Sequence, residues 1–281
     1  MPYYSPLRYP GGKRKLLPYL RKIITENNLS INNYVEPYAG GSAVALDLLF
    51  SGNVNDIYLN DIDKSIYAFW NSVMYDTDRF CEEILSTGLS ISEWENQKAK
   101  QENYDSLFDL GFSTFYLNRT NRSGIINGGV IGGKQQDGDY SMDARFNKSN
   151  LISRIRMISE HQSGIHLFNL DALDFLKTIL GDLERENTLI YLDPPYFLNG
   201  KKLYSNYYKS DDHKTIKEFV ESLSHKWIIS YDNVEAIKAL YKNFNIIEYS
   251  LSYTAQEKTL GEEIMIFSNQ LTAISPIVQY K

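Results

Sequence analysis

The feature that most constrains the fold is an alternation of short β-type runs with longer helix-like segments along most of the chain. The runs are rich in β-branched and aromatic residues, which favour strands, and the intervening segments have the apolar spacing typical of helices. The β-type runs cover residues 34–38, 57–60, 165–169, 189–193, 227–231, 246–251 and 264–268. The helix-like segments include 13–27, 43–50, 63–73, 171–180, 212–223 and 234–241. This alternation predicts an α/β fold with a mostly parallel sheet and helices on both faces.

The stretch 75–164 interrupts this alternation between the second and third β-type runs. It begins acid-rich and helix-like over 76–109, with nine acidic against three basic residues, and then becomes rich in glycine and polar residues. Such a shift in composition indicates an inserted subdomain. We therefore predict a main domain of residues 1–74 and 165–281, with an inserted, mainly helical domain of residues 75–164.

Composition limits the classes of protein and site that the chain can form. Its 281 residues carry a net charge of −6, with no apolar run as long as a membrane span and no signal-peptide pattern at the start. We therefore expect a soluble, cytoplasmic protein that does not contact a membrane. Cys81 is the only cysteine and the four histidines are scattered, so neither a disulfide nor a metal site is predicted. Basic residues nevertheless gather in residues 1–30, where six stand against one acid.

A glycine-containing turn follows the first β-type run, in the segment "NNYVEPYAGGSAVALDLL". Gly40 and Gly41 would let a ligand approach the backbone where α/β sheets bind nucleotide-like cofactors, and Ser42 is placed to cap the next helix. Asp61 ends the second run, at a place where an acid accepts hydrogen bonds from ribose hydroxyls. A plain turn and a helix cap at Asp61 are the alternatives, but the two features together favour a ribose-bearing cofactor.

Two phosphate-binding patterns fail on this chain. The glycine turn lacks the spacing G-x-G-x-x-G of dinucleotide-binding enzymes, which leaves a nicotinamide-dependent oxidoreductase as a weaker alternative. The segment "RYPGGKRKLL" is similar to a P-loop, but Leu7 stands where the first glycine belongs and Arg14 follows Lys13 in place of serine or threonine. A kinase-like function therefore loses its main support.

A stiff corner follows the fourth β-type run, in the segment "NTLIYLDPPYFLNG". Pro194 and Pro195 fix two φ angles and remove two backbone donors, so neither a strand nor a helix continues there. Asp193 stands at the mouth of the corner and Tyr196 just past it. A simple turn would more commonly use glycine, asparagine or one proline, which makes this corner a candidate site.

Five segments occur in the order "RYPGGK", "VEPYAGG", "LNDID", "DALDFL" and "DPPY". Together they resemble the DPPY class of N6-adenine DNA methyltransferases, and specifically the DNA adenine methylase group, also called the D12 class. The resemblance covers roughly residues 3–74 and 165–270. It implies a Rossmann-like sheet of seven strands, mostly parallel, in which the last strand is reversed.

The resemblance also implies roles for individual residues around S-adenosylmethionine, the methyl donor of this family. Tyr9 and Lys13 would contact its methionyl end, and Asp61 its ribose. Asp171 would meet its adenine. Tyr9 stands where many relatives have tryptophan, so an aromatic ring is kept at this position. The other cofactor contacts implied by the resemblance are Glu36, Pro37, Ala39, Gly41 and Asp193.

The proline corner then acquires a chemical purpose. Adenine's exocyclic amine is a poor nucleophile because its lone pair is delocalised into the ring. Asp193 and the carbonyl of Pro194 would accept both N6 hydrogens and free that lone pair. Tyr196 would stack on a base that has left double-stranded DNA, and no metal is needed. RNA adenine, cytosine N4 and protein glutamine are alternative substrates, and a non-catalytic nucleic-acid-binding relative is a further alternative.

The inserted domain is the candidate for reading the DNA sequence. Its candidate contacts are Asn118, Arg119, Arg122, Asn127 and Lys134, with Asn121, Arg145 and Lys148 also available. Members of the group that read GATC carry a loop N-R-x-x-x-N-G-x-x-R, whereas residues 118–127 read "NRTNRSGIIN". Asn127 replaces the final arginine and cannot present a guanidinium fork to guanine. We therefore predict an adenine-containing target other than plain GATC. A cognate restriction or defence system is an open partner.

Overall fold

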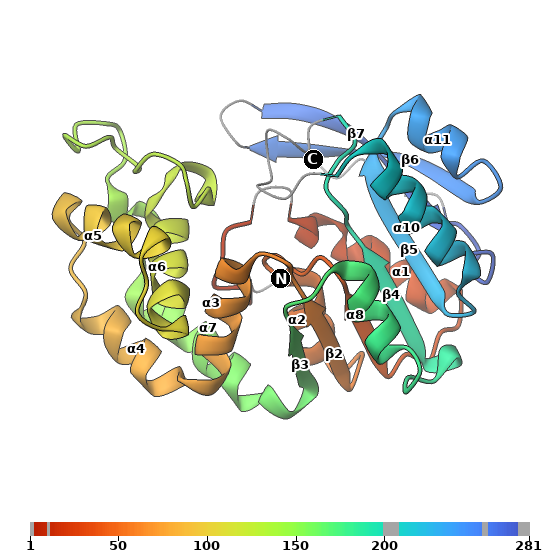
Figure 1. The fold of residues 1–281 in the computed structure, drawn as a ribbon, viewed down its shortest axis with the longest axis horizontal. Coiled ribbons are helices and arrows are strands. Elements are labelled where there is room, and N and C mark those ends of the chain that lie inside the picture. Colours follow the sequence, from red (N-terminus) through yellow and green to blue (C-terminus); the bar gives the residue numbers. More distant parts are fainter. Residues whose placement is uncertain (1–2, 10–11, 199–207, 255–257, 275–281) are drawn as a thin grey trace.

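The computed structural model of the chain places a seven-stranded sheet beside a group of helices (Figure 1). It describes residues 3–9, 12–198, 208–254 and 258–274. The strands are β1 (Asn33–Glu36), β2 (Asp56–Asn60), β3 (Ile165–Phe168), β4 (Thr188–Leu192), β5 (Lys226–Asp232), β6 (Asn245–Thr254) and β7 (Lys258–Phe267). The helices are α1 (Leu17–Glu26), α2 (Ala43–Phe50), α3 (Lys64–Tyr75), α4 (Thr77–Ser86), α5 (Ile91–Glu102), α6 (Leu107–Thr120), α7 (Lys148–Glu160), α8 (Ala172–Ile179), α10 (Ser210–Ser222) and α11 (Glu235–Leu240). None of the helices within the described ranges is long and apolar enough to cross a membrane.

The strands lie in the order β3-β2-β1-β4-β5-β7-β6. All pairs from β3 to β5 are parallel, whereas β7 lies antiparallel between β5 and β6. The seven predicted runs correspond to the seven strands, and the predicted mostly parallel sheet with a reversed last strand is confirmed. Strand order changes direction between β1 and β4, so the carboxyl ends of these two strands flank a crevice where α/β proteins bind ligands.

Helices cover both faces of the sheet, and each face has its own apolar core. Tyr34 of β1 packs in a core with Leu20 of α1. Its neighbour Val35 packs in a second core with Phe175 of α8 and Val220 of α10. Successive residues of a strand point to opposite faces, so a fully buried strand reads as a continuous apolar run. This burial explains why the strands were visible in the sequence.

The helices α4, α5, α6 and α7 form a group at one side of the sheet, next to α3 (Figure 1). Gly111 on α6 lets this helix lie against α3, because a Cβ at this position would be 2.4 Å from the carbonyl oxygen of Ala68. The rings of Phe69 on α3 and Phe115 on α6 stack with centroids 6.0 Å apart. The predicted boundary after residue 74 thus falls at the end of α3, a helix that packs against the inserted segment. The division into two domains stays a prediction.

The start of α2 differs from the prediction. Ser42 adopts a left-handed conformation with φ of +44°, and its hydroxyl makes no capping bond to the helix. Instead, Ser42 Oγ donates to the carbonyl of Ala39 at 3.3 Å, inside the turn. The prediction that Ser42 caps this helix is therefore wrong. At α3 the cap is Asp63, which accepts from the amide of Ser65 at 2.9 Å, so Asp61 is free of this task.

Candidate active site

The ring of Tyr9 packs against the turn that follows β1. A Cβ on Gly40 would lie 2.7 Å from Cε1 of Tyr9, and a Cβ on Gly41 would lie 3.0 Å from the Tyr9 Cβ. Gly40 also has a φ of +46°, which disfavours other residues. Its carbonyl accepts a hydrogen bond from Trp70 Nε1 at 2.9 Å. Glycine is therefore required at position 40 by both the backbone and the tyrosine ring.

Asp61 holds the same turn from the end of β2. Its Oδ2 accepts from the amide of Gly40 at 2.9 Å, and its Oδ1 accepts from the amide of Asp63 at 2.9 Å. Burial raises the pKa of Asp61 to about 7, although both hydrogen bonds act in the opposite direction. Each carboxylate oxygen has more than one lone pair, so Asp61 can still accept a bond from a ligand hydroxyl.

Asn60, the residue before Asp61, was not singled out from the sequence. Its side chain is fully buried and joins the ends of neighbouring strands. Asn60 Nδ2 donates to the carbonyls of Pro37 and Leu170 at 3.0 Å each, and its Oδ1 accepts from the amide of Leu170 at 2.9 Å. The only signal in the sequence was a polar residue at a buried strand position, next to the predicted ribose acid.

A cavity of about 560 Å³ lies at the carboxyl ends of β1, β2 and β4, within the size range of cofactor sites. The predicted cofactor residues on its wall are Tyr9, Lys13, Glu36, Ala39, Gly41, Asp61 and Asp193. Pro37 and Asp171 are not on its wall. Asp171 is exposed and caps α8, accepting from the amide of Leu173 at 2.9 Å. The residues present therefore fit a cofactor with a ribose and a cationic end.

Asp193 follows β4 and lies on the wall of this cavity. Its Oδ1 accepts from Ser230 Oγ at 2.7 Å and lies 3.3 Å from Lys13 Nζ. Burial raises the pKa of Asp193, and the ammonium of Lys13 opposes this rise. The chain beyond the corner is fixed by Asp232, which accepts from the amides of Phe197 and Leu198 at 2.9 Å each.

A buried network links this corner to the reversed strand β7. Glu263, with only 1% of its surface exposed, lies with each carboxylate oxygen 3.2 Å from Lys13 Nζ. It also accepts hydrogen bonds from the hydroxyls of Tyr196 and Tyr249. Burial opposes the charge of Lys13, but Asp193, Tyr196 and Glu263 hold the pKa of its ammonium well above the usual value. Sequence reasoning missed Glu263, because nothing in the run "TLGEEIMIF" separates it from the exposed Glu262 beside it.

Tyr196 is drawn inward by this network. Only 7% of its surface is exposed, and its hydroxyl bonds with Glu263 and Lys13. The ammonium of Lys13 also lies 4.9 Å from the centroid of its ring, a cation–π contact. The stacking of Tyr196 on a base stays a prediction. It concerns a ring that already contacts the ammonium of Lys13.

Two of the residues predicted to contact DNA lie inside the protein. Asn118, 1% exposed, accepts from the amide of Arg8 at 2.7 Å and donates to the carbonyls of Arg8 and Gly124 at 2.8 Å. Arg119, 8% exposed, donates to the carbonyls of Pro6 and Arg145. Both belong to the last turn of α6, where they bind the N-terminal segment. In this conformation neither side chain is presented to DNA.

The other candidates have different surroundings. Asn121 is buried and accepts from Trp94 Nε1 at 2.7 Å. Lys148 donates to the carbonyls of Leu85, in the last turn of α4, and Thr87, just after it. Arg122 and Asn127 are exposed, and Asn127 also lies on the wall of the cavity. Lys134 is exposed and paired with Glu95 at 2.7 Å. The structure thus leaves Arg122 and Asn127 facing solvent near the site, and it gives Asn121 and Lys148 internal partners.

Comparisons with known proteins agree over most of the chain. A family model for D12 class N6 adenine-specific DNA methyltransferases matches residues 9–255. Type II methyltransferase M.MjaIII of Methanocaldococcus jannaschii is 25% identical over 272 residues, which cover 85% of this chain and 88% of the relative. Type II methyltransferase M1.LlaDCHI of Lactococcus lactis subsp. cremoris is 21% identical over 279 residues, 91% of each chain. Type II methyltransferase M.FokI of Planomicrobium okeanokoites is 25% identical over 301 residues, which cover 93% of this chain and 42% of that relative.

Proposed function

Because the chain belongs to the D12 class of N6 adenine-specific DNA methyltransferases, we propose that methyl transfer takes place where its cavity reaches Asp193. S-adenosylmethionine supplies the electrophilic methyl group in this family. The observation that carries the proposal is a single cavity with Asp61 and Gly41 on its wall as well as Asp193. One cavity lined by both Asp61 and the proline corner supports a site in which the cofactor and the base lie side by side.

In this proposal the residues of the corner act on the amine of the target adenine. The carboxylate of Asp193 accepts one N6 hydrogen and the carbonyl of Pro194 accepts the other, so that the nitrogen lone pair turns toward the methyl donor. Ser230 and Lys13 hold the carboxylate of Asp193 in place, at 2.7 and 3.3 Å. Tyr196 stacks on the base in this proposal, as the family resemblance implies. The rate enhancement comes from the positioning of the adenine amine against the methyl donor, without a covalent intermediate on the protein.

The network also gives the site a charge that suits a cationic donor. Two acids, Asp193 and Glu263, lie 3.3 and 3.2 Å from the single ammonium of Lys13. Two acids beside one cation favour a positively charged ligand over a neutral product of the same shape. Asp61, on the wall of the same cavity, anchors the ribose in this proposal.

The proposal is tested by separating cofactor binding from chemistry. Asp193→Asn is expected to abolish methylation while S-adenosylmethionine still raises the melting temperature, because the acceptor for the N6 hydrogens is weakened but the ribose site is intact. Asp61→Ala is expected to reduce that thermal shift sharply. Asp174→Asn, an exposed acid on α8 paired with Lys177, is the matched control. Mass spectrometry of digested DNA should show N6-methyladenine, and N4-methylcytosine alone would overturn the assignment.

A finer proposal concerns the biological partner. The three relatives described above are named Type II methyltransferases. On that basis we propose that this chain protects DNA from a nuclease of the same specificity. The methylated motif identifies the nuclease to use. DNA from cells that express the chain is expected to resist cleavage by that nuclease. Cleavage at fully methylated sites would contradict the proposal.

A further inference from the structure

Five arginine side chains gather where the N-terminal segment meets the inserted helices. We call this group the arginine cluster; its members are Arg8, Arg14, Arg119, Arg145 and Arg154. Its centre is the ring of Tyr3. The guanidinium carbon of Arg154 lies 4.9 Å from the centroid of this ring, and that of Arg14 lies 5.1 Å from it. Both groups therefore make a cation–π contact with the same aromatic ring.

Arg8, Arg119 and Arg154 donate hydrogen bonds to backbone carbonyls, which carry no charge. Arg154 Nη1 donates to the carbonyl of Ser5 at 3.0 Å, and Arg8 Nη1 donates to the carbonyl of Asn121 at 3.2 Å. Arg119 Nε donates to the carbonyl of Arg145 at 2.7 Å. Within the described residues, no carboxylate forms an ion pair with Arg8, Arg119, Arg145 or Arg154.

The absence of acidic partners for these arginines occurs in a chain whose net charge is −6. Some other cations of the inserted segment do pair with acids, such as Lys134 with Glu95 at 2.7 Å. Burial, followed by the charges of Arg8 and Arg154, lowers the pKa of Arg119 to about 10. Burial, followed by the charge of Arg145, also lowers the pKa of Arg8. The fold thus holds like charges together at a cost that an anionic partner would offset.

The position of the cluster identifies that partner. Tyr3 and Arg14 belong to the cluster and also to the wall of the cavity that contains Asp193. An anion bound there lies at the mouth of the active site, so it must belong to the substrate or lie directly beside it. We infer that the arginine cluster binds backbone phosphates of duplex DNA next to the target adenine through Arg145 and Arg154, which are exposed or half-buried, while the buried Arg119 holds the carbonyl of Arg145. This inference rests on the proposed function, because it requires DNA at this cavity.

Phosphates fit the cluster better than base edges do. The Tyr3 ring and the carbonyl of Ser5 fix the guanidinium plane of Arg154, and a fixed planar fork suits a phosphate oxygen pair. Contacts to phosphates set the register of a protein on DNA and carry no sequence information of their own. The cluster is therefore expected to act equally on every DNA sequence, unlike the exposed Arg122 and Asn127.

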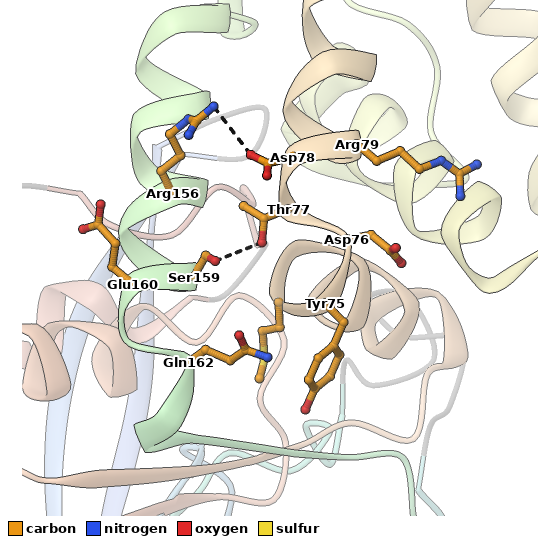
Figure 2. A pocket seen from close by; sticks show the side chains of 10 residues that line it. Tyr75, Asp76, Thr77, Asp78, Arg79, Arg156, Ser159, Glu160 and Gln162 are labelled. Carbon is orange, nitrogen blue, oxygen red and sulfur yellow. Dashed lines mark hydrogen bonds and ion pairs between the residues drawn. The ribbon is translucent and has the colours of Figure 1, made fainter.

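The test is the salt dependence of DNA binding by the full chain. Arg145→Gln and Arg154→Gln remove the charge but keep the side-chain carbons out to Cδ and a hydrogen-bond donor. Each is expected to reduce the slope of log affinity against log salt by about 1, equally for specific and random duplexes. The matched control is Arg156→Gln, also on α7, whose guanidinium pairs with Asp78 at 3.8 Å in a separate pocket (Figure 2). Its slope is expected to equal that of the wild type.

Several outcomes would overturn the inference. Unchanged slopes in both cluster variants, while the wild type binds DNA, would remove the arginine cluster from the DNA contacts. Loss of binding to RNA duplexes but not to DNA would assign the cluster to another nucleic acid. S-adenosylmethionine must still raise the melting temperature of each variant, which shows that it is folded. If the wild type bound no DNA at all, the proposed function would fail together with this inference.

Discussion

Lys13 is the residue on which the buried corner depends. Its ammonium lies 3.3 Å from Asp193 and 3.2 Å from Glu263, and its side chain is 4% exposed. Two carboxylates share this one cation. Without the ammonium of Lys13, the two acids would repel each other in a poorly solvated space. Breaking a buried pair by removing one partner is far more costly than the pair is stabilising.

This geometry predicts that Lys13→Met destabilises the protein more than Glu263→Gln does. Lys13→Met is expected to lower the free energy of unfolding by about 3–5 kcal/mol, because two buried carboxylates then remain without a cation. Glu263→Gln is expected to cost less than half as much, since Lys13 keeps Asp193 and the tyrosine hydroxyls keep a polar partner. Urea denaturation of both single variants and of the double variant measures the order. A Glu263→Gln variant as unstable as Lys13→Met would contradict it.

Glu36 gives a prediction about pH. Its carboxyl is buried at the end of β1, and burial raises its pKa from 4.5 to about 8, although the nearby hydroxyl of Tyr34 acts in the opposite direction. The folded state therefore binds this proton more tightly than the unfolded chain does. The contribution of Glu36 to stability is full below the unfolded pKa and is lost as the pH rises to the folded pKa.

Glu36→Gln keeps the shape of the protonated acid without titrating. The variant and the wild type are expected to be about equally stable near pH 4.5. The variant should become more stable as the pH rises toward 8, by an amount on the order of 4 kcal/mol when the shift is complete. Melting temperatures of both proteins across this pH range measure the difference. A constant difference at every pH would show that Glu36 does not titrate in this range.

At the scale of elements, the sequence was sufficient where local pattern and burial agree. The strands β1 and β4 are buried on both faces, so their apolar runs were visible. The predicted runs 34–38 and 189–193 end within two residues of the observed ends at Glu36 and Leu192. The segment 118–127 was read as one recognition loop, but residues 118–120 end α6 and are buried. Asn118 bonds Arg8, 110 residues away, and no local pattern shows such a partner. The same reason hides Glu263, which meets Lys13 across 250 residues.

At the scale of the whole molecule, the inserted segment contributes to the cavity as well as to the outer surface. Residues 121 and 130 form a β-bridge that closes a short loop, and Asn127 within it lies on the wall of the same cavity as Asp61. Gly124 fixes the base of the loop, because a Cβ there would lie 2.3 Å from the carbonyl oxygen of Arg8. The family predicted from five short segments is confirmed by a match that runs through this insert, over residues 9–255.

The same arrangement directs the last prediction, which concerns the methylated sequence. Asn127 stands where the GATC-reading loop has its final arginine, and asparagine lacks the fork that gives about 1–3 kcal/mol of discrimination for guanine. Arg122 is exposed at the start of the loop and is the nearest substitute within it. We expect an adenine-containing target other than plain GATC, and a changed or relaxed motif on Arg122→Ala or Asn127→Ala. Lys134→Ala is the matched control, because Lys134 is already paired with Glu95.

Methylation-aware long-read sequencing of DNA from a host that expresses each variant reads the motif directly. The wild type and Lys134→Ala are expected to give one motif, and Arg122→Ala a broader set, since loss of a base contact relaxes specificity at that position. S-adenosylmethionine binding serves as the folding control for Arg122→Ala, whose side chain is not on the cavity wall. Full protection of host DNA from a nuclease that cuts only unmethylated GATC would show that Asn127 does not exclude this target, and that another residue supplies the missing guanine contact.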